Sequence, residues 1–271
     1  MTREDAERAL AAAGAAPDDQ FSLFEAALSC ALHENPDRDA NVARALATEA
    51  AERLAERLIA ERPEEAICEA LGGDLGLRAD DLNYEDLANA DLISVCERRQ
   101  GLPVALGVLY MEAARRRQLT VSGVDFPGHF LLRIETDEGP IALDPLAGGR
   151  VVLPSELTRR AFAAGLTSDV ADRIDLLMAP VRDRQVALRL QNNIFARASR
   201  ARDFASAERS ALRVALLDPE DHRPWLDVAA AREGQGALNG ALEALARARF
   251  LDGGAEIAAR AARERMRMRL N

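Results

Sequence analysis

The sequence predicts an α+β fold that is mainly helical, with a small antiparallel sheet in the middle and helical repeats at the end. Three observations support this fold class. Aromatic residues make up only 4% of the 271 residues, and alanine and leucine, which favour helices, fill most apolar positions. The apolar period changes to two after residue 121. After residue 180 the sequence repeats itself at an offset of 34 residues.

The first third of the chain is expected to form a helical region, residues 1–94. Helices are predicted over residues 3–13, 21–33, 40–61 and 64–72. In the second of these, Phe24, Leu28 and Leu32 follow the spacing of one buried stripe. Gly72 and Gly73 are a typical end signal for the fourth helix.

A segment that is apolar nearly all round follows at residues 102–111, within a predicted core domain of residues 95–180. A helix without a polar face is expected to be central and buried. Pro103 suits its first turn, where a missing N–H is not needed. Gly107 lowers helix stability, which predicts that another backbone approaches closely there.

Strands are predicted at VSGV (121–124), HFLLRIE (129–135) and PIALD (140–144), with a hairpin turn between the last two. The apolar pattern favours a register in which Leu132 faces Leu143 and Ile134 faces Ile141. In that register His129 is the diagonal neighbour of Asp144 on the opposite face, within side-chain reach. A carboxylate that orients an imidazole is the base half of a nucleophilic triad.

The third predicted domain, residues 181–271, carries the repeat. A shift of 34 residues aligns Phe204 with Leu238 and Ala207 with Ala241. This period with small packing residues is typical of tetratricopeptide repeats, with Trp225 near the start and Gly236 at the turn. A plain helical bundle is the alternative. A capping helix is expected at 255–269.

Charge and composition exclude several function classes. Residues 1–94 hold 8 arginines against 22 acidic residues, which argues against nucleic-acid binding. No apolar run is long enough for a membrane span, and the N-terminus lacks a secretory signal pattern. The spacing of Cys30, Cys68 and Cys96 matches neither a zinc site nor a disulfide framework, which favours a cytoplasmic location. No metal or other cofactor is predicted, because no His or Cys pair has ligand spacing and no phosphate loop is present.

Three motifs together carry a family resemblance. The stretches CERRQGLPVALGVLYMEAARRRQL, GVDFPGHFLLR and LDPLAGG resemble the transglutaminase-like domain of the bacterial SirB family. The resemblance implies a papain-type core between an N-terminal helical region and tetratricopeptide repeats. It also implies that His129 and Asp144 occupy the transglutaminase His and Asp positions.

The resemblance to transglutaminases does not extend to the nucleophile. Transglutaminases have a cysteine at the start of the buried helix, but Pro103 occupies this position here, without a thiol or hydroxyl beside it. Cys96 is the one other candidate, and its place on an apolar helical face favours a packing role. Arg98 and Arg99 lie just before the helix. Two roles are open for them: they form ion pairs within the protein, or they act as a clamp that binds a substrate.

Two functions remain open. The first is a catalytically degenerate, non-enzymatic protein that binds a protein or peptide partner, with Trp225, Arg98 and Arg99 as candidate contacts. The second is a cysteine acyltransferase or hydrolase that uses Cys96, His129 and Asp144. The sequence does not indicate the oligomeric state.

Overall fold

The computed structural model describes residues 1–252 and 260, in two compact units. The first unit holds residues Met1–Phe21, Ser29–Asp37 and Ala187–Asn271, and the second holds Ser22–Leu28 and Arg38–Val186. The predicted helix 255–269 lies outside the described residues except at Arg260. Among the described residues, no helix has the length and apolar character that a membrane span requires. The predicted division at residues 94 and 180 stays a prediction.

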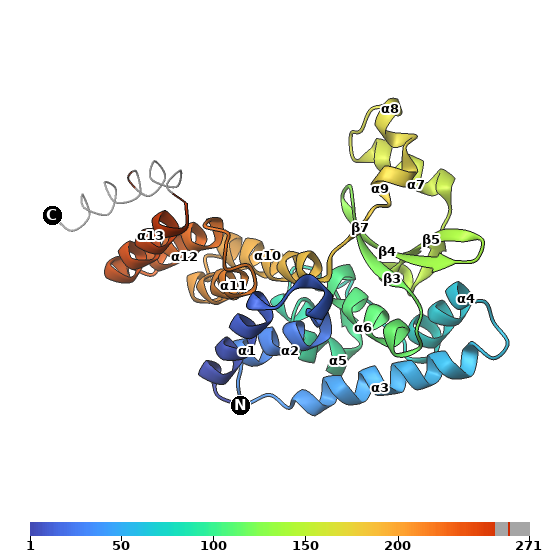
Figure 1. The fold of residues 1–271 in the computed structure, drawn as a ribbon, viewed down its shortest axis with the longest axis horizontal. Helices are drawn as coiled ribbons and strands as arrows, with labels where there is room; N and C mark the ends of the chain where they lie inside the picture. Colours follow the sequence, from blue (N-terminus) through green and yellow to red (C-terminus); the bar gives the residue numbers. More distant parts are fainter. Residues whose placement is uncertain (253–259, 261–271) are drawn as a thin grey trace. The chain divides into compact units, whose positions relative to one another are not determined.

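The second unit is built on a five-stranded antiparallel sheet with the order β6-β5-β4-β3-β7 (Figure 1). Its strands are β3 (Val121–Phe126), β4 (His129–Thr136), β5 (Gly139–Asp144), β6 (Arg150–Val152) and β7 (Pro180–Val181). The predicted register is confirmed, since Leu132 pairs with Leu143 and Ile134 with Ile141. The two edge strands β6 and β7 were not predicted, because runs of two or three residues are too short to show a period.

One face of the sheet packs against the buried helix α6 (Pro103–Arg116). The helix begins at Pro103 and is buried nearly all round, as predicted. Gly107 does meet a close neighbour, but the expectation of another backbone was wrong. A Cβ at Gly107 would lie 2.5 Å from Cε1 of Phe130, an aromatic ring that projects from β4. The glycine therefore makes room for a side chain of the sheet.

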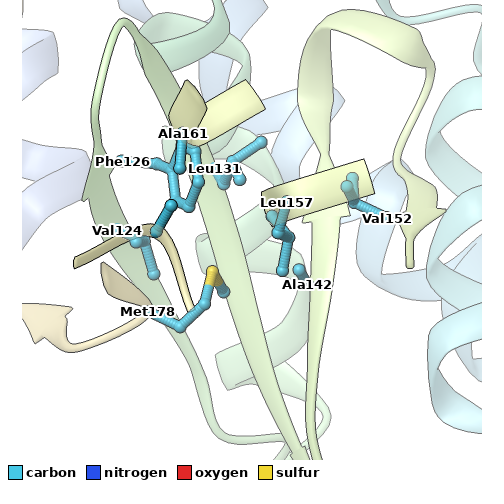
Figure 2. Close-up of a cluster of buried hydrophobic side chains, with 9 residues drawn as sticks. Val124, Phe126, Leu131, Ala142, Val152, Leu157, Ala161 and Met178 are labelled. Atoms are coloured by element: carbon cyan, nitrogen blue, oxygen red, sulfur yellow. The ribbon is translucent and has the colours of Figure 1, made fainter. Parts of the chain in front are cut away.

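The other face of the sheet is covered by α7 (Pro154–Ala163), α8 (Ser168–Ala171) and α9 (Ile174–Leu177) (Figure 1). Figure 2 shows this second core, in which Phe126 and Leu131 from the strands meet Leu157 and Ala161 from α7. Burial of both faces explains why β4 carries apolar residues on each side at its centre.

The second unit has further helices, of which α3 and α5 pack against α6 and α4 packs against α3 and η2. They are α3 (Ala40–Arg57), α4 (Pro63–Ile67) with the π-helical turn η2 (Cys68–Asp74), and α5 (Leu92–Arg98). The short parallel strands β1 (Arg78–Ala79) and β2 (Gln100–Gly101) pair with each other. The 3-10 turns are η3 (Leu87–Asn89) and η4 (Pro145–Ala147).

The described part of the first unit is helical. It comprises α1 (Arg3–Ala15), η1 (Asp18–Gln20), the last part of α2 (Leu23–Glu34), most of α10 (Asp183–Ala201), α11 (Phe204–Leu217), α12 (Arg223–Gly234) and α13 (Leu238–Leu251). Helices α11 and α13 begin and end 34 residues apart, as the repeat offset predicts. Gly236 has a φ of +77° in the turn between α12 and α13, a conformation that favours glycine. Ala211, Ala241 and Ala244 lie in the apolar cluster that joins these helices.

Candidate functional site

His129 begins strand β4 directly after the Pro127–Gly128 turn. The turn needs glycine because φ at Gly128 is +75°. The His129 side chain is exposed and forms no hydrogen bond or ion pair with any described residue. The imidazole is therefore accessible but is not oriented by a neighbouring side chain.

Asp144 ends strand β5 and is only 5% exposed. Its Oδ2 accepts a hydrogen bond from Nη2 of Arg160 at 2.8 Å, and its Oδ1 accepts one from the Leu146 N–H at 3.0 Å. The strand register places Asp144 and His129 on the same face of the sheet, as expected. However, the described residues show no hydrogen bond between them. The Asp144 carboxylate binds Arg160 of helix α7 instead, and the role of Asp144 in orienting His129 stays a prediction.

An ion-pair network surrounds this carboxylate. Nη2 of Arg160 also donates to Oε1 of Glu156 at 2.8 Å, and Nη2 of Arg150 donates to the same oxygen at 2.8 Å. The hydrogen bond from Arg150, with a further one from Arg160, lowers the pKa of Glu156 to about 2. The network joins the end of β5, β6 and helix α7, so Asp144 acts as a structural clamp.

Hydrogen bonds, backbone conformation and close packing around Asp144 explain the sequence of the loop LDPLAGG. Asp144 caps the turn η4 through the Leu146 N–H, and its backbone oxygen accepts from the Gly149 N–H at 2.8 Å. Gly148 and Gly149 have φ values of +65° and +81°. A Cβ at Gly149 would lie 2.7 Å from Cε1 of Tyr110 on α6. The two glycines are thus required by backbone conformation, and Gly149 also by the buried tyrosine.

Tyr110 is fully buried, and its hydroxyl has no hydrogen-bond partner among the described residues. Burial raises its pKa, and the nearby Cys68 and Asp144 raise it further. Nη1 of Arg160 is likewise buried and without a partner in the described part of the chain. Sequence reasoning missed both residues as members of this region. A tyrosine in an otherwise apolar helix was the available signal, because a buried hydroxyl needs a partner.

Cys96 lies in α5 and is only 5% exposed. Burial raises the pKa of its thiol to about 12, and the carboxylates of Asp91 and Glu97 add to this. A thiol with such a pKa is protonated at neutral pH and is a poor nucleophile. The described residues show no hydrogen bond between Cys96 and His129. The geometry agrees with a packing role for this cysteine.

Cys68 is half-buried, and burial raises the pKa of its thiol too. Cys30 is buried in α2. At the start of α6, Leu102 is the residue before the first turn and Pro103 is the first helical residue. The structure thus brings no thiol into hydrogen-bond contact with His129 among the described residues.

The two arginines before α6 form bonds within the second unit. Arg98 donates to Oδ2 of Asp80 at 3.2 Å and to Oδ1 of Asn89 at 2.9 Å. Arg99 has a positive φ of 56° and donates to the backbone oxygen of Leu75 at 2.9 Å. These bonds hold the irregular segment before α5 and the approach to α6. A clamp on a substrate would require both side chains to leave these partners.

Trp225, the third candidate contact, is half-buried on α12 in the first unit. The guanidinium of Arg247, on α13, lies 5.9 Å from the centre of its ring. No group of three or more His, Cys, Asp or Glu side chains that could hold a metal ion occurs among the described residues.

Comparison with known proteins identifies the family. A model described as the transglutaminase-like superfamily matches residues 41–192, more than half of the chain. The chain belongs to the transglutaminase-like superfamily. It is 33% identical over 237 residues to a UPF0162 protein of Xylella fastidiosa strain Temecula1, covering 85% of this chain and 84% of that protein. A UPF0162 protein of strain 9a5c is 33% identical over 208 residues, which is 74% of each chain.

Another UPF0162 protein, from Vibrio cholerae, is 31% identical over 152 residues, 54% of this chain and 55% of that protein. No solved structure matches the chain significantly. The matched transglutaminase-like region contains α6, the whole five-stranded sheet and the Asp144 network.

Close packing explains the glycines in two sequence motifs of the matched region, at Gly101 and Gly149. A Cβ at Gly101 would lie 2.6 Å from Cγ2 of Val95 and 3.0 Å from the backbone oxygen of Asn89.

Proposed function

We propose that this transglutaminase-like protein is a catalytically degenerate member of its superfamily that acts as a protein-interaction or regulatory module. The observation that carries the proposal is the partner of Asp144. Its carboxylate is bound by Arg160 and by a backbone N–H, and the exposed His129 is left without an orienting group among the described residues. A general base needs such an orienting partner to hold the correct tautomer and position.

The position of the thiols supports the same proposal. An acyltransferase or hydrolase would need Cys96 as a thiolate next to His129. Cys96 is buried, and the pKa of its thiol is raised to about 12. Pro103 is the first residue of α6, the position where the resemblance to transglutaminases implies a cysteine nucleophile.

The interaction half of the proposal concerns the helices after residue 180. The 34-residue offset between α11 and α13 supports a tetratricopeptide-like module of the SirB type. Such repeats usually bind extended or helical peptides on the concave face of the array. A cytoplasmic protein or peptide is the proposed partner, with Trp225 as a candidate contact.

A thiol-labelling experiment tests the enzymatic alternative. We expect an electrophilic thiol probe at neutral pH to label Cys96 slowly, and unfolding in denaturant to make labelling fast. The matched control is Cys96→Ser, which removes this labelling and leaves Cys68 and Cys30. Fast labelling of folded protein at Cys96, combined with an acyl-transfer or amidase activity that is lost in both Cys96→Ser and His129→Ala, would overturn the proposal.

Affinity capture with the full chain tests the interaction half. We expect a specific protein to be retained by the wild type and retained less by Trp225→Ala, with His129→Ala as the matched control. Equal retention by both variants would remove Trp225 from the contact surface. Failure of the wild type to retain any protein above background would count against an interaction module.

A further inference from the structure

A buried histidine in the first unit lies at the junction of three helices. His33, in the last turn of α2, is only 1% exposed. Its Nε2 lies 3.2 Å from Oε1 of Glu7 on α1. The neutral imidazole therefore donates from Nε2, which leaves Nδ1 without a proton. Nδ1 is buried and has no hydrogen-bond partner among the described residues.

The same turn of α2 is held by arginines from two other helices. Arg3 of α1 donates to the backbone oxygen of His33 at 3.0 Å and to that of Glu34 at 3.3 Å. Arg213 of α11 is fully buried and donates to the backbone oxygen of Cys30 at 3.3 Å. Cations at a helix C-terminus complement its partial negative charge. The positive charges of Arg3 and Arg213 therefore both act on His33.

The carboxylates nearby do not balance a third positive charge. The side chain of Glu34 already receives hydrogen bonds of 2.8 Å from both Arg209 and Arg213. Burial acts to raise the pKa of Glu34, but these hydrogen bonds hold it below its usual value. Glu7 is the remaining carboxylate, and its side chain is 40% exposed, so water screens its charge.

We propose that His33 is a proton-sensitive latch that holds α1 against the last turn of α2 while its imidazole is neutral and releases α1 when the ring takes up a second proton. The second proton enters at Nδ1, where it becomes a buried donor that lacks an acceptor among the described residues. It also adds a buried positive charge beside Arg213 and Arg3. Release of α1 exposes its buried apolar residues, Ala6 and Leu10.

The direction of the pH dependence follows from this environment. Burial, and next the charge of Arg213, lower the pKa of His33, against the opposing influence of Glu7. The unfolded chain, with a histidine pKa of 6.5, binds the proton first on acidification. The contribution of His33 to stability is therefore complete above about pH 6.5 and is lost as the pH falls through its lower folded-state pKa.

Another titrating group of the first unit acts in the opposite direction. Burial, with the charge of Asp221, raises the pKa of Asp227 on α12 to about 6. A carboxyl group whose pKa is raised in the folded state makes the folded protein more stable as the pH falls. This stabilisation by Asp227 partly hides the destabilisation expected from His33. The variant Asp227→Asn removes the pH-dependent contribution of Asp227 to stability and leaves that of His33.

The test measures hydrogen exchange of α1 in the full chain. We expect α1 amides, corrected for intrinsic exchange, to exchange faster at about pH 5.5 than at about pH 7.5. The unfolding equilibrium constant of the first unit, followed by fluorescence of the single tryptophan Trp225, should rise by up to about tenfold over this range in the Asp227→Asn background. His33→Gln cannot take up the proton and should remove both effects.

Two further histidines provide matched controls. His222, in the first unit, and His129, in the second, are the remaining histidines of the chain. Gln substitution of either should leave the pH effect on α1 unchanged. The latch is overturned if wild-type α1 exchanges equally at both pH values or if His33→Gln keeps the wild-type response. It is also overturned if the His33 imidazole, followed by nuclear magnetic resonance in the wild type, titrates at or above pH 6.5.

Discussion

Substitution of Arg160 by Met should destabilise the second unit, because it leaves the buried Asp144 carboxylate with one hydrogen bond, from the Leu146 N–H. The side chains of Asp144 and Arg160 are only 7% and 17% exposed. Removing one partner of a buried ion pair costs about 3–5 kcal/mol, and the remaining bond and partial exposure favour the lower value. Met also removes the unpartnered Nη1 donor, which returns about 1 kcal/mol. The expected net loss is about 2 kcal/mol, or about a 30-fold change in the unfolding constant.

Urea unfolding can report this loss separately for the two units. Both tyrosines of the chain, Tyr84 and Tyr110, lie in the second unit, whereas the single tryptophan, Trp225, lies in the first. We expect Arg160→Met to lower the urea midpoint measured by tyrosine near-ultraviolet circular dichroism.

Arg159→Met is the matched control, because Arg159 is exposed and has no partner among the described residues. Asp144→Asn added to Arg160→Met should recover part of the loss, since an amide leaves no buried charge unpaired. The clamp would be refuted if Arg160→Met unfolded within about 0.5 kcal/mol of the wild type, or if the double variant were no more stable than Arg160→Met.

Three other substitutions test the site and its support. His129→Ala should change the free energy of unfolding by less than about 0.5 kcal/mol, because the exposed imidazole has no partner among the described residues; a loss of 1 kcal/mol or more in urea unfolding would indicate a hydrogen bond after all. Gly107→Ala should cost about 1 kcal/mol, since the clash with Phe130 outweighs the gain in helix propensity; a more stable variant in thermal unfolding would contradict this packing. Gly149→Ala should cost about 2–4 kcal/mol through its positive φ and its contact with Tyr110, and an unchanged urea midpoint would show that the loop adapts.

The sequence was most informative where a local period determines the structure. The register of β4 and β5 follows from alternation, because a slip by one residue would expose Leu132 and Ile134. Pro103 and the apolar run after it located α6 for a similar reason. The 34-residue offset reappears in the bounds of α11 and α13.

The partners of side chains were harder to predict, because they depend on segments far apart in the chain. A diagonal position on neighbouring strands brings His129 within reach of Asp144 but does not exclude a competitor. Arg160 reaches Asp144 from a helix that follows the sheet, and no sequence period indicates that contact. Gly107 was recognised as a site of close approach, but its neighbour is the ring of Phe130.

The contact between Gly72 and Gly148 has a consequence for how the family can vary. A Cβ at Gly72 would lie only 2.0 Å from the backbone oxygen of Gly148, so the turn η2 and the loop after β5 touch through bare main chain. A larger residue at position 72 could be accepted only together with a displaced loop, which would also move the Asp144 clamp. Among relatives that keep the LDPLAGG loop, position 72 is therefore expected to stay glycine, and relatives that lose one of the two features should lose the other.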